Sequence, residues 1–234
     1  MFDLLILLAL SLQGAILGLL VVAVRRRNVP AAVNASGAFV LAVLPTVLEI
    51  GLRTGLGEQL ALNPLLAIWL GVAGFLHSLG MLGLYDTTWW WDHLTHTVSA
   101  ALAAALLYAA FLVAFPSLSG NIPWPDSVGS MTVAFTLVIG IFWELLELLA
   151  RDVADRLDVE PVLVHYGWRD TAADLVFDIL GAIVVVALDV RIFVSIVERF
   201  PALTEGLLVA SGWIVVFGSI AIPLFVGVDG SIRF

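Results

Sequence analysis

The sequence predicts an all-α fold, a polytopic bundle of about seven transmembrane helices, from its composition, its hydropathy and its apolar runs. Of the 234 residues, 62% are hydrophobic and 12% are charged, whereas about a quarter of the residues of a soluble domain are charged. The mean hydropathy is +1.09. The apolar runs approach the roughly 20 residues that one span needs, and no soluble domain fits between them. Residues 1–234 are therefore expected to form a single integral membrane domain.

Seven apolar runs are expected to be helices, because every backbone polar group in the hydrocarbon must bond within its own segment. They lie at about Leu4–Val24, Ser36–Leu52, Leu62–Tyr85, Trp90–Phe115, Ser130–Ala150, Asp170–Val190 and Leu207–Val226. The first is longer than the core of a signal peptide, and its basic residues follow it. The second is short and contains Pro45, so six spans with a re-entrant second helix is the alternative.

The fourth, fifth and sixth runs have characteristic residues at or before their first positions. Trp89, Trp90 and Trp91 stand where the fourth run begins and indicate an aromatic belt at the membrane interface. A loop with three prolines, residues 116–129, separates the fourth run from the fifth. The sixth opens on acidic residues.

The basic residues, all of them arginines, predict the orientation, since they favour the cytoplasmic ends of spans. With the cluster at 25–27 placed inside, seven arginines lie inside and three lie outside. The inner set is Arg25, Arg26, Arg27, Arg151, Arg156, Arg169 and Arg233, and the outer set is Arg53, Arg191 and Arg199. We expect a multi-pass protein of the cell membrane, with its N-terminus outside and its C-terminus in the cytoplasm.

Composition also excludes several functions. The chain has no cysteine, so disulfides and thiolate metal sites are excluded. Its formal charge is −9, which gives no support for nucleic-acid binding, because that needs a basic patch. Membrane lipid is the expected partner, with a lipid or small molecule as substrate. The oligomeric state is not predicted.

Ionisable residues gather at the predicted inner ends of three helices. Each costs roughly 2.5–3.5 kcal/mol at the centre of a span, so a cluster indicates partners or a use. The set is Asp92, His93, His96, Glu144, Glu147, Asp170, Asp174 and Asp178. Spacings of three and four residues put each group on one helix face. Because successive helices run in opposite directions, His96, Glu144 and Asp174 are expected at one depth, roughly 8–9 Å from the inner surface.

Charge predicts what this cluster binds. Its six carboxylates outnumber the nearby cations, which are Arg169 and, when protonated, the two histidines. Like charges in a poorly solvated place must bind protons or a cation. Carboxylate and imidazole suit Mg²⁺, Mn²⁺, Zn²⁺ or Fe²⁺, and helices that carry Glu and His can hold two metals. We expect a divalent metal ion on His96, Glu144, Glu147 and Asp174, with Asp92 and Asp178 as the catalytic carboxylates.

Three motifs carry a family resemblance. The run Asp92-His93-Leu94-Thr95-His96 resembles the Asp-x-x-x-His signature of VanZ-like and YjdF-like small polytopic membrane proteins. Their acidic pair of the form Glu-x-x-Gln is matched by Glu144 and Glu147, and their Arg…Asp-x-x-x-Asn-x-x-Gly segment is matched by Arg169, Asp174, Asp178 and Gly181. The resemblance covers a VanZ-like core at 89–186. Asp178 and Glu147 depart from the pattern toward greater acidity. The family's activity is largely undefined, so the resemblance implies a shared site and no named reaction.

Structural roles compete with the functional ones. Asp92 and Asp170 are placed to cap the helices that they open, and Glu147 is four residues before Arg151. His77, the only histidine of its helix, is interpreted as a satisfied helix-contact residue. Gly181 is expected to permit close helix packing.

The sequence is compatible with three functions. The leading hypothesis is a metal-dependent enzyme that acts on a lipid or isoprenoid head group at the cytoplasmic interface. The first alternative is a proton- or cation-coupled transporter, although such sites usually lie at the midplane between repeats, and no internal repeat is seen. The second is a non-catalytic membrane protein whose polar cluster fixes helix packing.

Overall fold

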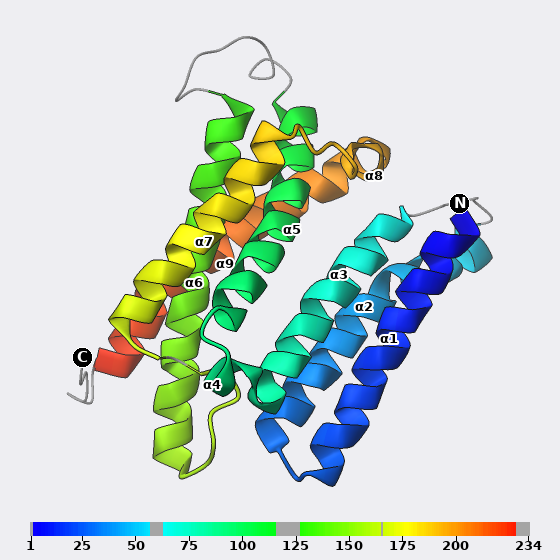
Figure 1. The fold of residues 1–234 in the computed structure, drawn as a ribbon. Helices are drawn as coiled ribbons and strands as arrows, with labels where there is room; N and C mark the ends of the chain where they lie inside the picture. The colour runs from blue at the N-terminus through cyan, green and yellow to red at the C-terminus, as the bar shows by residue number, and fades with distance from the viewer. Residues whose placement is uncertain (1, 57–62, 116–126, 165, 228–234) are drawn as a thin grey trace. The chain divides into compact units, whose positions relative to one another are not determined.

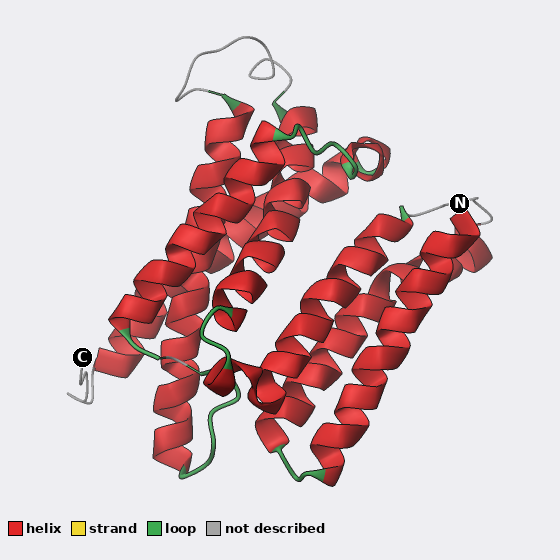
Figure 2. Cartoon of the chain, viewed as in Figure 1, coloured by secondary structure: helices red, strands yellow, loops and turns green. Residues whose placement is uncertain are grey.

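The structure is a computed structural model that describes residues 2–56, 63–115, 127–164 and 166–227. These residues form helices and short connections, with no strand among them (Figures 1 and 2). The elements are α1 (Phe2–Arg25), α2 (Val29–Leu56), α3 (Pro64–Leu79), the π-helical stretch η1 (Gly80–Leu84), α4 (Tyr85–Thr87), α5 (Trp91–Ala114), α6 (Val128–Leu157), α7 (Trp168–Ala187), α8 (Val194–Arg199) and α9 (Pro201–Gly227). Arg233 and His165 lie outside the described residues.

Six of the described helices are long and apolar enough to cross a membrane, namely α1, α2, α3 with its continuation to Thr87, α5, α6 and α9. Helix α7 has the 20 residues of a span but carries four charged ones, at positions 169, 170, 174 and 178. Its exposed side chains include Val176, Leu180 and Val184, while its buried face holds Asp174 and Asp178. Apolar residues outward and acids inward are typical of a helix in lipid. The predicted all-α polytopic bundle is confirmed, with about six to seven spans.

Helix α2 is one continuous helix, so the alternative in which it forms a re-entrant segment is wrong. It begins at Val29 rather than near residue 36, and it continues through Pro45 to Leu56. Asn28 caps its first turn, where the Ala31 backbone N–H donates to the Asn28 side chain at 2.9 Å. Because the apolar stretch begins earlier than predicted, the helix is long enough to span the bilayer without turning back.

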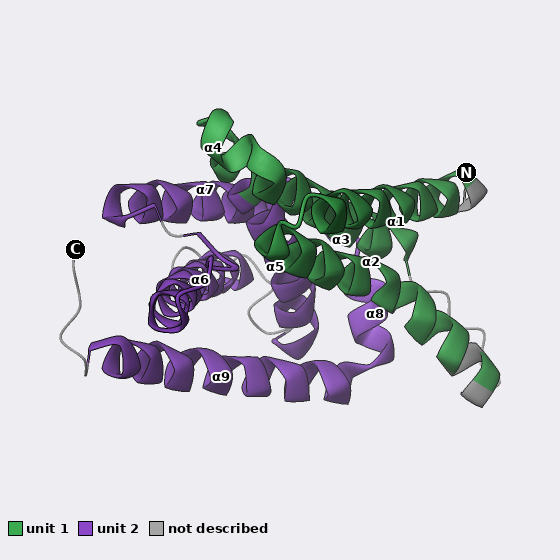
Figure 3. Cartoon of the chain, turned by 90° about the horizontal axis from the view of Figure 1, so that it is seen from below, with its two compact units in different colours: residues 1–95 green, residues 96–234 purple. Residues whose placement is uncertain are grey.

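Contacts divide the chain into two compact units, residues 1–95 and 96–234, with the boundary inside α5 (Figure 3). In the first unit α1, α2 and α3 pack on one another. A Cβ on Gly74 would stand 2.8 Å from the Cβ of Ala38, so α2 and α3 touch through small residues. The buried Gln13 side chain donates to the Ala42 carbonyl at 2.9 Å and links α1 to α2. These contacts follow the membrane rule of small residues and internal polar bonds.

In the second unit α6 packs against both α7 and α9. Ser127 caps α6 by accepting a hydrogen bond from the Ser130 N–H at 3.2 Å, and Asp158 ends the helix in the left-handed conformation, with φ of 54°. At that end Arg156 lies 4.8 Å over the Phe225 ring of α9 and pairs with Asp152 at 2.7 Å. The second unit therefore contains α6 and α7, the helices that carry Glu144, Asp174 and Asp178.

Candidate functional site

The centre of the site is a contact between α5 and α7. The Nδ1 atom of His96 lies 3.1 Å from Oδ1 of Asp178, and both side chains are buried. This hydrogen bond holds the imidazole ring of His96 against the carboxyl group of Asp178. A histidine that binds a metal does so through one neutral ring nitrogen, while the other nitrogen hydrogen-bonds to a partner.

Two glycines bring the helices close enough for this contact. A Cβ on Gly181 of α7 would stand 2.6 Å from the backbone oxygen of Thr97 on α5, so the two backbones nearly touch. A Cβ on Gly140 of α6 would stand 2.3 Å from Oδ2 of Asp178. The Asp178 carboxylate therefore occupies the space that a larger residue at position 140 would fill. Close packing at Gly181 was predicted from the sequence and is confirmed.

Helix α6 contributes a second buried carboxylate. The Thr171 hydroxyl of α7 donates to Oε2 of Glu144 at 2.7 Å, and Glu144 is 5% exposed. Its other oxygen, Oε1, is buried and has no hydrogen-bond partner among the described residues. His96, Asp178 and Asp170 are near enough to act electrostatically on this carboxylate. A buried carboxylate oxygen without a donor is costly, which makes it a place for a proton or a cation.

Asp174 and Asp92 extend the cluster. Asp174 is 2% exposed and lies one turn after Thr171 on α7, and Asp92 lies one turn before His96 on α5. One carboxylate oxygen each of Asp92 and Asp174 and one ring nitrogen of His96 all lie within 4.8 Å of one another. Three such atoms at this separation are a donor set that a divalent cation can bridge, and His with carboxylate suits Zn²⁺, Mn²⁺ or Fe²⁺.

Arg169, the fixed positive charge expected near the cluster, contacts a neighbouring aromatic ring instead. The Arg169 guanidinium lies 5.4 Å from the ring of Trp168, and both side chains are exposed. His93 stacks edge-on with Trp89, with ring centroids 6.4 Å apart. Protons or a bound cation can neutralise buried acids.

Other residues singled out from the sequence have local partners. Glu147 accepts a hydrogen bond from the Trp143 indole of its own helix at 2.9 Å, and it is half-buried. Asp170 lies in the first turn of α7, whose N-cap is Gly167, so the predicted capping role of its side chain is not observed. It remains well placed for the helix dipole. His77 bonds through Nδ1 to the Tyr85 hydroxyl at 2.6 Å, which confirms it as a satisfied residue.

Sequence reasoning missed Thr171 and Gly140. Thr171 is one residue after Asp170 and three before Asp174, so it shares the buried side of α7. A hydroxyl beside acids in a span is a signal for a donor to a buried carboxylate. Gly140 lies one turn before Glu144 on α6, and a glycine at that spacing marks where another side chain crosses the helix.

Comparison with known proteins identifies a family for this chain. The family model described as "Predicted membrane protein (DUF2238)" matches residues 7–195. No curated protein and no solved structure matches the chain. The family match supports a polytopic membrane protein and does not carry the VanZ-like or YjdF-like names. Since the matched region includes most of the chain and every residue of the acidic cluster, this protein belongs to the family of predicted membrane proteins DUF2238.

Proposed function

We propose that the protein is a divalent-metal-dependent membrane enzyme that acts on the head group of a lipid or isoprenoid at the cytoplasmic interface. The observation that carries the proposal is the donor set of Asp92, His96 and Asp174, whose ligand atoms lie within 4.8 Å of one another. Two of these three side chains are buried. Buried acids of one sign need positive charge, and a metal ion supplies it where the arginine side chain of position 169 does not.

In this proposal the surrounding residues have separate roles. Asp178 orients the ring of His96 through Nδ1, and Nε2 would be the nitrogen that binds the metal, as in sites where a carboxylate stands behind a ligating histidine. Thr171 holds one oxygen of Glu144, and the open Oε1 is placed to accept a proton from a water or a substrate hydroxyl. Glu147 lies one turn further along α6 and bonds to Trp143, so it is not needed as a ligand.

The depth of the proposed ligands in the membrane supports a lipid head group as the substrate. His96 is five residues after the start of α5, and Asp174 is six after the start of α7. At 1.5 Å per residue these positions are roughly 8–9 Å from the helix ends, which is where the polar part of a lipid lies in a bilayer about 40–45 Å thick with its head groups. A bound metal would polarise a head-group oxygen or activate a water beside it.

The test is the metal content of the full-length protein, purified in mild detergent without chelators and measured by plasma mass spectrometry. About one divalent ion per chain is expected in the wild type, and His96→Ala and Asp174→Asn are expected to lose it. Asp155→Asn is the matched control, because Asp155 is an exposed acid on α6. Each variant is also checked for helicity and monodispersity.

A folded wild type without metal, in media supplied with Mg²⁺, Mn²⁺, Zn²⁺ and Fe²⁺, contradicts the proposal. Proton uptake by the same acids in a metal-free protein would instead favour the coupled transporter. Loss of folding in both His96→Ala and Asp174→Asn, with no metal in the wild type, would favour a structural cluster.

A further inference from the structure

A second feature of the 96–234 unit lies at the other end of its helices. An apolar groove of about 710 Å³ is lined by the last turns of α5, the first turns of α6, and α8 and α9. Along α5 it begins some 15 residues after His96, which is about 22 Å at 1.5 Å per residue. The groove and the acidic cluster are therefore separate sites. Its volume is within the 300–1,000 Å³ range of ligand pockets.

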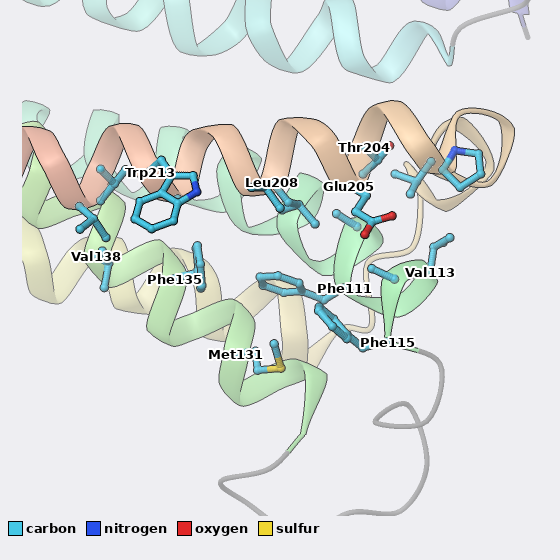
Figure 4. A pocket seen from close by; sticks show the side chains of 18 residues that line it. Phe111, Val113, Phe115, Met131, Phe135, Val138, Thr204, Glu205, Leu208 and Trp213 are labelled. Carbon is cyan, nitrogen blue, oxygen red and sulfur yellow. The ribbon is translucent and has the colours of Figure 1, made fainter.

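Aromatic side chains shape the groove (Figure 4). Phe111 is buried and meets Phe135 edge to face, with ring centroids 5.4 Å apart. Trp213 lies toward one end, and Glu205 and Val113 lie toward the other. Of the lining residues, only Thr204 and Glu205 are polar, and Glu205 is the one with a charge. The Thr204 hydroxyl already donates to the Phe200 carbonyl at 3.0 Å.

The dimensions fit one hydrocarbon chain. On α9 the lining runs from Pro201 to Val216, which is about 22 Å of helix. Half of the roughly 30 Å hydrocarbon core of a bilayer is about 15 Å, so the tail of a lipid in one leaflet can lie wholly within the groove. Helices α5, α6 and α9 are each long and apolar enough to span the membrane, which puts the groove in contact with lipid tails.

The charge of Glu205 favours one class of lipid head group. Glu205 is exposed and stands one turn after the start of α9, about 6 Å along the helix. An acid at that level attracts an ammonium group and repels an anionic head group that lacks one. We propose that the groove is a binding site for a phospholipid with an amine-bearing head group, such as phosphatidylethanolamine, whose acyl chain lies against Phe111 and Trp213 and whose ammonium pairs with Glu205.

Two glycines of α9 provide a matched test. A Cβ on Gly212 or on Gly206 would meet nothing within 4 Å, so either position accepts a larger side chain. Gly212 lines the groove and Gly206 does not. Gly212→Leu therefore fills the groove, while Gly206→Leu adds the same side chain to the same helix outside it.

The experiment measures bound lipid on the full-length protein by native mass spectrometry, in detergent with equal added phosphatidylethanolamine and phosphatidylglycerol. The wild type is expected to retain phosphatidylethanolamine preferentially. Gly212→Leu is expected to lower that binding about tenfold, and Gly206→Leu to leave it unchanged. Glu205→Gln is expected to keep the chain-binding site but to equalise the two lipids, since only the head-group interaction is removed.

Three lipid-binding outcomes overturn the proposal. They are equal retention of the two lipids by the wild type, wild-type binding by Gly212→Leu, and an equal loss in both leucine variants. A dimer that forms in place of the lipid complex, and that Gly212→Leu abolishes, would assign the groove to a second copy of the chain and also overturn it. If Gly212→Leu does not fold, the Glu205→Gln comparison alone decides, since that residue is exposed.

Discussion

The Nδ1 atom of His96 and the Oδ1 atom of Asp178 lie 3.1 Å apart in the buried contact between α5 and α7. The two residues are 82 positions apart in the sequence, so the pair forms only when the second half of the chain has folded. A buried histidine and a buried carboxylate in one hydrogen bond fix each other's orientation. A change to one member of this pair therefore tests how the cluster is held in place.

Asp178→Asn tests whether Asp178 positions His96. Asparagine keeps the size of the side chain but does not hold the imidazole in one tautomer with the same strength. We expect the affinity for a divalent metal to fall by about 10–100-fold, the usual effect of losing such a partner. Competition titration against a fluorescent chelator measures it, with Asp155→Asn as the control. Unchanged affinity with unchanged stability would show that the pair has no role in metal binding.

Thr171→Val tests the hydrogen bond to Glu144. Valine matches the shape of threonine, but it removes the hydroxyl that donates to Oε2 at 2.7 Å. Because a hydrogen bond to a charged group contributes about 1.5–3 kcal/mol, the free energy of unfolding is expected to fall by about that amount. Unfolding in mixed micelles with increasing dodecyl sulfate measures it.

The matched control for this change is Thr136→Val. Thr136 is also buried on α6, but its hydroxyl donates at 2.8 Å to the Thr132 carbonyl of its own helix, so a much smaller effect is expected. A double-mutant cycle with Glu144→Ala isolates the pair. A cycle that shows no coupling would mean that Thr171 does not stabilise the carboxylate.

Gly181→Ala tests the approach of α5 and α7. The added Cβ would stand 2.6 Å from the Thr97 backbone oxygen, which cannot rotate away. We expect the helices to separate at a cost of about 1–3 kcal/mol in the free energy of unfolding. Gly206→Ala is the control, because its Cβ meets nothing within 4 Å. That change is expected to stabilise α9 by about 0.5–1 kcal/mol, and the same micelle assay compares the two. A stabilising Gly181→Ala would contradict the close contact.

Asp189 gives a prediction on pH. The Arg191 guanidinium at 2.7 Å, and then the Tyr108 hydroxyl, hold the pKa of Asp189 below its ordinary value. A lowered folded-state pKa means that the stabilisation is complete above about pH 4, the ordinary carboxyl range, and is lost as the pH falls through the lowered value. The side chains of Asp189 and Arg191 are 54% and 58% exposed, so the effect is small and salt-sensitive.

The measurement for Asp189 is the difference in free energy of unfolding between the wild type and Asp189→Asn as the pH is lowered. This difference is expected to shrink toward zero as the pH falls through the lowered pKa of Asp189. Arg191→Gln is expected to move the same decline to higher pH, because it removes the main cause of the lowered pKa. A difference that does not depend on pH would rule out the ionised Asp189 as the stabilising form.

The helices could be predicted from the sequence because uninterrupted apolar runs leave the backbone one way to bond in lipid. Their ends could not. Helix α6 continues to Leu157, past the predicted end near Ala150, because its last turns are amphipathic rather than apolar. Helix α9 likewise begins at Pro201, before its most apolar part. The short helix α8 was not predicted, since six residues carry no readable period.

The acidic cluster could be predicted from the spacing and depth of its residues. The hydrogen-bonded pairs within it could not. Spacing places Asp174 and Asp178 on one face of α7, but it does not tell which of them faces His96. That choice depends on the rotation of α7 against α5, which the backbone contact at Gly181 determines. The donor for Glu144 was missed for the same reason, since Thr171 becomes a partner only once α6 and α7 are packed together.

The π-helical stretch η1 makes the chain sensitive to length at one point. A π-turn holds one residue more than an α-turn, and within this stretch the non-helical conformation of Gly83, with a φ of 127° and a ψ of 0°, kinks the chain. The Tyr85 ring lies where a Cβ on Gly80 would be, and its hydroxyl reaches His77. Deleting one residue from 80–84 would turn the helical residues that follow by about 100° around the axis. Tyr85 would then leave His77, although no side chain of that pair had been altered.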